Sequence, residues 1–175
     1  CTFCHRLDDP SVKGYNLRLQ TEPSAQELIH EIGDPARFDE VVFCGYGEPT
    51  LRLEVIKEVA RAVKARGGRI RLNTNGHGNL IHKRNILPEL AGLVDTVSVS
   101  LNAENAEKYL TICQPAYGFG AYDSVLAFIK EAKQSIPEVV VSIVRLPNVD
   151  VKACERMARQ ELGVKFRLRE LDAIG

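Results

Sequence analysis

The sequence lacks an excess of charge of either sign, a long apolar run and a regular set of cysteine pairs. Its 23 basic and 23 acidic residues balance over 175 residues, which gives no support to nucleic-acid or membrane binding by charge. No apolar run is long enough to span a bilayer. The five cysteines, an odd number at irregular spacings, do not suggest a disulfide framework. These absences favour a cytoplasmic protein with reduced thiols.

The stretch 41–50 is the centre of the functional pattern in this sequence. Its first three residues are apolar and predict a buried strand. Gly45 and Gly47 then let the backbone approach a ligand closely, because neither carries a Cβ. Glu48 is the only charged residue of the stretch. It follows a predicted strand, and ligands of parallel α/β folds bind at the C-terminal ends of strands.

Simpler interpretations of the same stretch stay open. Glu48-Pro49-Thr50 is also a typical helix start, because glutamate and proline are both common in the first turn. A phosphate-binding loop is not indicated, since position 50 is neither Gly nor Ala and no Gly-Lys-Ser/Thr follows.

The sequence opens with Cys1-Thr2-Phe3-Cys4, two cysteines separated by two residues. Such a pair serves in thiol–disulfide exchange, in zinc binding or in an iron–sulfur site. Zinc is weakly supported, because it normally takes four close ligands and no second Cys-x-x-Cys is present. Because the chain starts with cysteine rather than methionine, we expect a further segment upstream. Cys44, Cys113 and Cys154 stand alone in the sequence, and buried structural thiols are expected there.

Apolar segments alternate with helical patterns in the order typical of a parallel α/β sheet. Strands are predicted near residues 41, 70, 97, 140 and 167, about 30 residues apart. A capping box from Ser24 to Glu27 begins the first helix. Further helices are predicted over 53–65, 83–93, 104–112, 121–135 and 150–162. Five strands are too few for an eight-stranded barrel, so an open doubly wound sheet or a partial barrel is expected.

Polar residues gather where the predicted strands end. They are Gly45–Glu48, Asn73–Asn75, Ser100, Asn102 and, within the next strand, Ser142. Each one alone is explained by a turn or by a satisfied core position, but on successive strand ends they favour a polar ligand. Arg167 and Arg169 share one face of the last strand. They either meet an anionic substrate or lie at a solvent-facing edge.

In combination, these motifs resemble the radical S-adenosylmethionine (SAM) superfamily, whose signature is Cys-x-x-x-Cys-x-aromatic-Cys after the first barrel strand. Cys1, Phe3 and Cys4 match the second half of it, and the first cysteine would lie four residues before Cys1. Tyr46-Gly47-Glu48-Pro49 is similar to the family's Gly-Gly-Glu-Pro motif, with tyrosine in the first position. The sequence looks most like the TatD-associated radical SAM proteins, over segments 43–50, 73–76 and 97–103.

The resemblance implies a partial (β/α)6 TIM-like barrel with parallel strands whose first strand is missing from this chain. Residues 1–175 would form a single core domain, incomplete at its N-terminus. It implies an enzyme whose 4Fe-4S cluster reductively cleaves SAM to a 5′-deoxyadenosyl radical, which takes hydrogen from an unknown substrate. Cys1 and Cys4 would hold the cluster together with a third cysteine upstream of Cys1. An electron donor such as flavodoxin or ferredoxin would reduce it.

The resemblance also implies positions for the SAM contacts. Tyr46 and Gly47 would offer backbone groups to the methionine end, and Glu48 would accept a hydrogen bond from the ammonium group. Phe3 would pack beside the adenine. The other implied contacts, where the family often has an acid or a lysine, are Asn73, Ser100, Asn102 and Ser142.

Other functions stay open at this point. A thiol–disulfide oxidoreductase using Cys1 and Cys4 would need neither iron nor Glu48. A non-catalytic iron–sulfur module would hold a cluster without cleaving SAM. Within the family, an activase that installs a glycyl radical on a partner is a further alternative, but no ferredoxin-like cysteine cluster favours it.

Overall fold

The computed structural model describes residues 1–4, 11–12 and 14–171 of the chain. Its strands are β1 (Ser11–Val12), β2 (Tyr15–Asn16), β3 (Val41–Phe43), β4 (Ile70–Thr74), β5 (Thr96–Ser100), β6 (Glu138–Val144) and β7 (Lys165–Arg169). Its α-helices are α1 (Ala25–Ile32), α2 (Leu53–Ala65), α3 (Gly78–His82), α4 (Leu87–Leu90), α5 (Ala106–Cys113), α6 (Ala121–Ser135) and α7 (Val151–Arg156). Tighter 3-10 turns are η2 (Pro35–Arg37), η3 (Pro49–Arg52) and η4 (Gly118–Gly120), and η5 (Met157–Glu161) is a π-helical turn. Within these described ranges, no helix is long and apolar enough to cross a bilayer.

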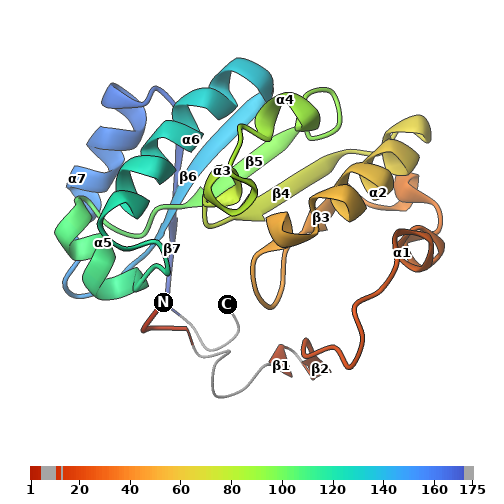
Figure 1. The fold of residues 1–175 in the computed structure, drawn as a ribbon, viewed down its shortest axis with the longest axis horizontal. Helices are drawn as coiled ribbons and strands as arrows, with labels where there is room; N and C mark the ends of the chain where they lie inside the picture. Colours follow the sequence, from red (N-terminus) through yellow and green to blue (C-terminus); the bar gives the residue numbers. More distant parts are fainter. Residues whose placement is uncertain (5–10, 13, 172–175) are drawn as a thin grey trace.

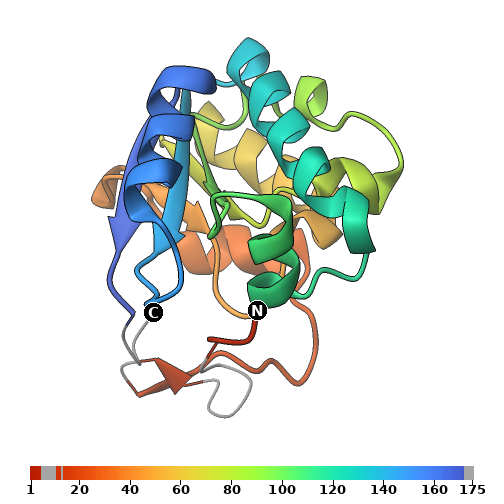
Figure 2. The ribbon, with the colours of Figure 1, turned by 90° about the vertical axis from the view of Figure 1, so that its left-hand side faces the viewer.

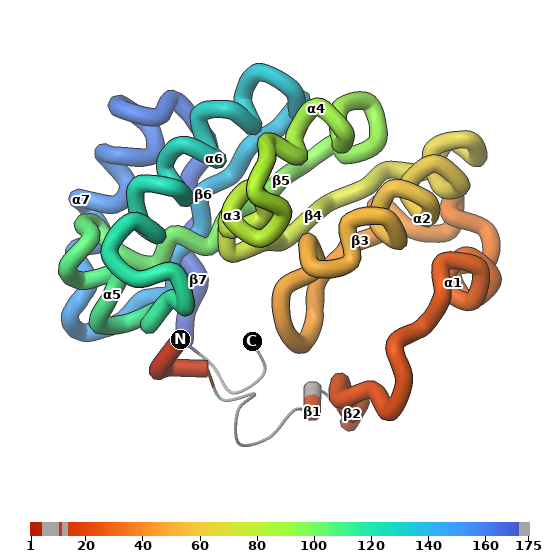
Figure 3. Tube along the Cα trace, in the orientation of Figure 1, coloured from red at the N-terminus to blue at the C-terminus, as the bar shows by residue number. Residues whose placement is uncertain are grey.

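Five parallel strands form the main sheet in the order β3-β4-β5-β6-β7, which is also their order in the chain. Helices lie between successive strands, as the tube in Figure 3 shows. A doubly wound sheet reverses its strand order partway, whereas a barrel adds its strands in sequence. The sequential order therefore confirms the predicted α/β architecture as a partial barrel and excludes the doubly wound alternative.

One face of this sheet, here called the outer face, carries the hydrophobic core. Figure 1 shows α2, α4, α6 and α7 along this side of the sheet. The strand residues that meet these helices are apolar and fully buried, among them Ile70, Leu72, Val97, Val99, Val141 and Ile143. Because side chains alternate along a strand, each of these residues is flanked by neighbours that point to the opposite face.

The opposite face, here called the inner face, is polar. The register pairs Arg71 with Thr96 and Asn73 with Ser98. Ser100 pairs with Ser142, and Ser142 pairs in turn with Arg167 on the next strand. Its polar residues on β4 to β7 include Arg71, Asn73, Thr96, Ser98, Ser100, Ser142, Arg167 and Arg169. A closed eight-stranded barrel fills its interior with bulky apolar side chains. A polar interior instead indicates space for a polar ligand.

Local sequence signals place most of the helices correctly, and α1 begins at the predicted capping box. The Ser24 hydroxyl accepts from the Glu27 amide, and the Glu27 carboxylate accepts from the Ser24 amide at 2.7 Å. The helix predicted over 83–93 is confirmed only as the short helix α4, and a second short helix that was not predicted, α3, precedes this range. Lys83 ends α3 in the left-handed conformation, with φ of 52°, and a proline in the first turn of α4 begins the next helix.

The expectation that β3 is buried is also wrong. Val42 is 36% exposed, and the residues on either side of it are only half-buried. The reason is topological, because β3 is an edge strand of the described sheet and its pairing partner is β4. Apolar residues therefore predict a strand here, but not its place in the sheet.

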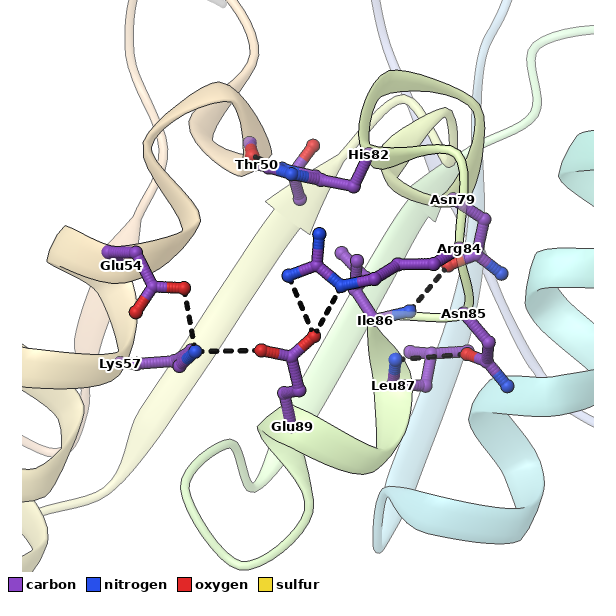
Figure 4. A network of polar contacts seen from close by, with 10 residues as sticks. All are labelled: Thr50, Glu54, Lys57, Asn79, His82, Arg84, Asn85, Ile86, Leu87 and Glu89. Carbon is purple, nitrogen blue, oxygen red and sulfur yellow. Dashed lines mark hydrogen bonds and ion pairs between the residues drawn. The ribbon is translucent and has the colours of Figure 1, made fainter.

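A network of ion pairs joins α2 to α4 in the helical layer (Figure 4). Lys57 Nζ donates to the carboxylates of Glu54 and Glu89, at 2.7 Å each. Glu89 also accepts from Arg84, with a nitrogen–oxygen distance of 2.9 Å. Hydrogen bonds from Lys57 and then Arg84 lower the pKa of Glu89 to about 2. This shift links the stability of the α2–α4 contact to pH.

Glu89→Gln is expected to lower the melting temperature at neutral pH by more than Glu54→Gln does. Both carboxylates accept from Lys57, but the Glu54 side chain is 76% exposed whereas that of Glu89 is 30% exposed. The folded-state pKa of Glu89 lies below its ordinary value of 4.5. Its stabilising effect is therefore present above about pH 4.5 and is lost as the pH falls towards about 2. Thermal unfolding at several pH values measures this, and equal losses in both variants at neutral pH would contradict it.

Candidate functional site

The loop between β3 and η3 forms one wall of the candidate site, at the C-terminal ends of the strands. Gly45 and Gly47 have φ angles of 111° and 96°, which residues with a side chain rarely adopt. A Cβ built at either glycine has no atom within 4 Å, so open space borders this backbone. Tyr46, between them, is 46% exposed. Figure 1 shows this orange loop on the side away from α2, α4 and α6.

The carboxylate of Glu48 ties the end of β3 to the end of β4. Its Oε1 accepts from the Thr50 amide (3.0 Å), the Thr50 hydroxyl (2.6 Å) and the Thr74 hydroxyl (2.7 Å). Its Oε2 accepts from the Asn75 amide at 2.8 Å, the only bond to this oxygen among the described residues. Glu48 is thus the N-cap of η3, as the helix-start interpretation predicted. The contacts to β4 go beyond a cap, and Oε2 keeps the capacity to accept from a ligand.

Asn73 presents an unpaired polar atom at the same end of β4. Its Oδ1 is buried and has no hydrogen-bond partner among the described residues. Leaving a buried acceptor unsatisfied costs about 1–3 kcal/mol, which a ligand donor would offset. Asn73 lies on the inner face, opposite Ser98 in the register. This observation supports the prediction that Asn73 contacts a ligand.

His77 connects the end of β4 to α5. Its backbone amide donates to Asn75 Oδ1 at 2.8 Å, and its Nε2 lies 3.0 Å from the Tyr109 hydroxyl. Its ring also meets the ring of Tyr117 edge-on, with centroids 5.5 Å apart. Burial lowers the pKa of His77, although the charge of Glu48 opposes this. The ring is therefore neutral near pH 7 and acts as a structural link.

Cys1 and Cys4 stand on one tight turn that is docked on α5. The Cys4 amide donates to the Cys1 carbonyl at 3.2 Å. Thr2 donates both its amide (2.8 Å) and its hydroxyl (3.1 Å) to the Ile112 carbonyl near the end of α5. Figures 1 and 2 both place the N-terminus beside this helix. Cys1 is exposed, Cys4 is half-buried and Phe3 packs against the core.

The remaining predicted contacts lie along β5 and β6. Ser100 and Ser142 are direct register partners on the inner face, and Ser142 is only 2% exposed. Asn102 is buried, and its Oδ1 accepts from the Val144 amide at 3.1 Å. Asn102 therefore joins the end of β5 to the end of β6. Its role as a SAM contact stays a prediction.

The other three cysteines occupy two kinds of environment. Cys113 and Cys154 are buried as expected, and burial raises the pKa of their thiols to about 11 and about 12. These thiols are protonated at neutral pH and inert. The expectation that Cys44 is buried is wrong, because it is exposed. It directly follows β3, which lies at the edge of the sheet and pairs with β4 alone among the described strands.

Thr50 and His77 were not predicted as residues of this site, and Thr74 was predicted only as a member of the polar group Asn73–Asn75, without its contact to Glu48. Thr74 meets Glu48 because the register places Phe43 opposite Leu72, so that β3 and β4 end side by side. The Thr50 carbonyl lies 2.7 Å from His82 Nε2, which fixes η3 against α3 (Figure 4). A threonine two residues after a capping acid is a usable local signal, whereas the Thr74 contact depends on strand pairing.

Comparisons with known proteins identify similar sequences and a similar fold. An uncharacterized protein of Methanocaldococcus jannaschii, MJ0804, is 33% identical over 112 residues, which cover 63% of this chain and 37% of that protein. The crystal structure of a radical SAM methyltransferase from Sphaerobacter thermophilus superposes with a TM-score of 0.59 at 19% identity, covering 97% of this chain and 51% of that one. The chain thus spans about half or less of the length of these two proteins.

The family comparison covers most of the chain. The model of the Radical SAM superfamily matches residues 1–160, a range that includes the cysteine turn, the glycine loop and strands β3 to β6. The solved neighbour supports the same fold independently. The chain therefore belongs to the radical SAM superfamily.

Proposed function

We propose that this chain forms the core of a radical SAM enzyme that binds a 4Fe-4S cluster and SAM at the C-terminal ends of its strands. The observation that carries the proposal is the Glu48 carboxylate, fixed by four hydrogen bonds beside two glycines that border open space. A turn with two cysteines lies at the end of the neighbouring helix α5. The likeness to TatD-associated radical SAM proteins belongs to this proposal, and so does hydrogen abstraction from a substrate whose identity is unknown.

The residues present fit such a cluster. Cys1 and Cys4 supply two thiols from one turn, and we place the third ligand, another cysteine, upstream of Cys1. In the described part of the chain, no group of three or more His, Cys, Asp or Glu side chains could hold a metal ion. When bound and reduced, the cluster supplies the electron that cleaves SAM to methionine and a 5′-deoxyadenosyl radical for hydrogen abstraction. A flavodoxin or ferredoxin is the proposed electron donor.

The side chains around the strand ends would bind and orient SAM. Glu48 Oε2 would accept from the amino group of the methionine end, an ion-assisted hydrogen bond of about 1.5–3 kcal/mol. The backbone of Tyr46 and Gly47 would line the same end, and Phe3 would pack beside the adenine. Asn73 Oδ1 would accept from a ribose hydroxyl, which satisfies its missing bond. Ser100, Ser142 and Asn102 are proposed as further contacts.

The test uses the full-length protein with its native N-terminus, reconstituted anaerobically with iron and sulfide. After reduction and addition of SAM, we expect 5′-deoxyadenosine, measured by liquid chromatography with mass detection. An intact, reducible cluster that yields no product would favour the non-catalytic module. A protein without cluster that forms a reversible Cys1–Cys4 disulfide would favour the thiol–disulfide oxidoreductase. A stable radical on an added partner protein would identify the activase.

A further inference from the structure

Three buried side-chain atoms lack a hydrogen-bond partner among the described residues: Arg71 Nε, Asn73 Oδ1 and Arg169 Nε. All three belong to the inner face of the sheet. Native structures satisfy most buried polar atoms, so several exceptions on one face indicate a ligand there. The proposed function assigns Asn73 to SAM. The two arginines are not accounted for by SAM binding.

The carboxylates near this face are already paired with other cations. Glu40 forms an ion pair with Arg71, and Glu138 forms one with Lys165. Both pairs lie at the N-terminal ends of the strands, far from the strand mouth. The acidic side chains of the inner face therefore form ion pairs at the N-terminal ends of the strands. They do not neutralise the cations that lie nearer the C-terminal ends.

Arg167 and Arg169 are inner-face cations without an ion-pair partner among the described residues. They are two residues apart on β7 and point to the same face. Among the described residues, neither forms an ion pair with a carboxylate, and Arg169 Nη2 makes only a long contact of 3.4 Å with Ser100 Oγ. Burial and the adjacent charge of Arg167 lower the pKa of Arg169. Two neighbouring guanidinium groups, one of them largely desolvated, create a strong preference for an anion.

Space for a ligand is available next to these arginines. A pocket of about 250 Å³ lies on the inner face, towards the N-terminal ends of the strands. Arg167 lines it together with Arg71 and Ser98, and the two ion-paired carboxylates Glu40 and Glu138 also line it. Arg169 lies two residues nearer the C-terminal end of β7 than Arg167, beside Ser100. The arginine pair therefore stands between this pocket and the proposed SAM site.

We propose that Arg167 and Arg169 bind an anionic group of the substrate, a carboxylate or a phosphate, on the inner face of the barrel. The inference rests on the proposed function, because it takes the inner face as the substrate side of the SAM site. The anionic group of the substrate and the carboxylate of SAM would lie at different places in the site. The methionine end is placed at Glu48, in the loop that follows β3, and four strand spacings of about 4.8 Å separate β3 from β7 along the sheet.

The experiment measures anion binding without turnover. Inorganic phosphate and succinate are titrated separately into the reconstituted full-length protein by calorimetry, at an ionic strength held constant with chloride. We expect Arg169→Gln and Arg167→Gln each to raise the dissociation constant of the bound anion about tenfold or more. Arg167 is exposed, so its variant keeps the test valid if Arg169→Gln fails to fold. The anion that binds more tightly to the wild type identifies the group as phosphate or carboxylate.

The control variant is Arg159→Gln, which removes an arginine that pairs with Glu155 at the helical surface. It should leave anion binding unchanged. A wild type that binds neither anion, or arginine variants that bind as well as the wild type, would overturn the proposal. SAM binding is measured in parallel by equilibrium dialysis and should stay within about twofold in both arginine variants.

Two further outcomes separate this inference from the function it builds on. A joint loss of SAM and anion binding in Arg169→Gln would assign the arginines to the carboxylate of SAM and overturn the inference. Anion binding that depends on both arginines, in a wild type that makes no 5′-deoxyadenosine, would overturn the proposed function and leave the anion site standing.

Discussion

Replacing Cys4 with alanine is expected to reduce cluster iron, sulfide and 5′-deoxyadenosine formation in the full-length protein to background. The proposed cluster takes three thiolates, and its ligands must be held close together. Cys4 stands on the turn that Thr2 anchors to the carbonyl of Ile112. Because this turn is held in place, we do not expect it to shift and bring another ligand to the position of the lost sulfur. Iron and sulfide per protein after anaerobic reconstitution measure the effect directly.

Cys44→Ala is the matched control for this experiment. Cys44 is exposed and follows the edge strand next to the glycine loop, but it lies outside the cysteine turn. We expect this variant to keep the iron content of the wild type. Full iron content in Cys4→Ala would refute the ligand assignment, and loss of iron in Cys44→Ala would place the third thiolate at Cys44 instead of upstream.

Glu48→Gln is expected to weaken SAM binding by about 10- to 150-fold while the iron content stays unchanged, because it removes an ion-assisted hydrogen bond. The substitution also disturbs the site itself. All four bonds to Glu48 come from donors, including the hydroxyl of Thr74 and the amide of Asn75. A glutamine NH₂ would turn one of these contacts into a clash of two donors. Equilibrium dialysis with labelled SAM measures the affinity.

Thr74→Val separates the charge of Glu48 from its structural role. Valine keeps the shape of the buried threonine and leaves the charge of the carboxylate in place, but it removes the bond to Oε1 and the bond that the hydroxyl accepts from the Gly76 amide (3.0 Å). We expect a loss of about 1–3 kcal/mol in the free energy of unfolding, with a much smaller effect on SAM affinity than in Glu48→Gln. Urea unfolding and dialysis give the two quantities. An equal loss of SAM affinity in both variants would mean that Glu48 serves only to position the strand ends.

The structure also explains how the two halves of the proposed site are held in register. Glu48 accepts from the Asn75 amide, the Asn75 side chain accepts from His77, and His77 meets Tyr109 of α5. The last turn of α5 in turn carries the cysteine turn through Thr2. A continuous chain of hydrogen bonds and packed rings therefore links Glu48, the proposed partner of the SAM amino group, to Cys1 and Cys4, the proposed cluster ligands.

The sequence by itself determined the features that depend on neighbouring residues. The capping box at Ser24 begins α1, and the positive φ angles at Gly45 and Gly47 follow from the residue type. Alternating apolar segments placed the five parallel strands, and the resemblance to the radical SAM signature pointed to Cys4 and Glu48, whose roles stay predictions. These signals are local, because a cap, a turn or a periodic face is set within a few residues.

Only the tertiary structure decided what depends on strand pairing and burial. The strand order distinguished a partial barrel from a doubly wound sheet, and β3, the edge strand among the described strands, leaves Cys44 exposed. The contact between Glu48 and Thr74 joins residues on different strands. The unpaired atom of Arg169 likewise exists only because the inner face removes it from water. Such features arise from the register between distant segments, which one-dimensional periodicity does not encode.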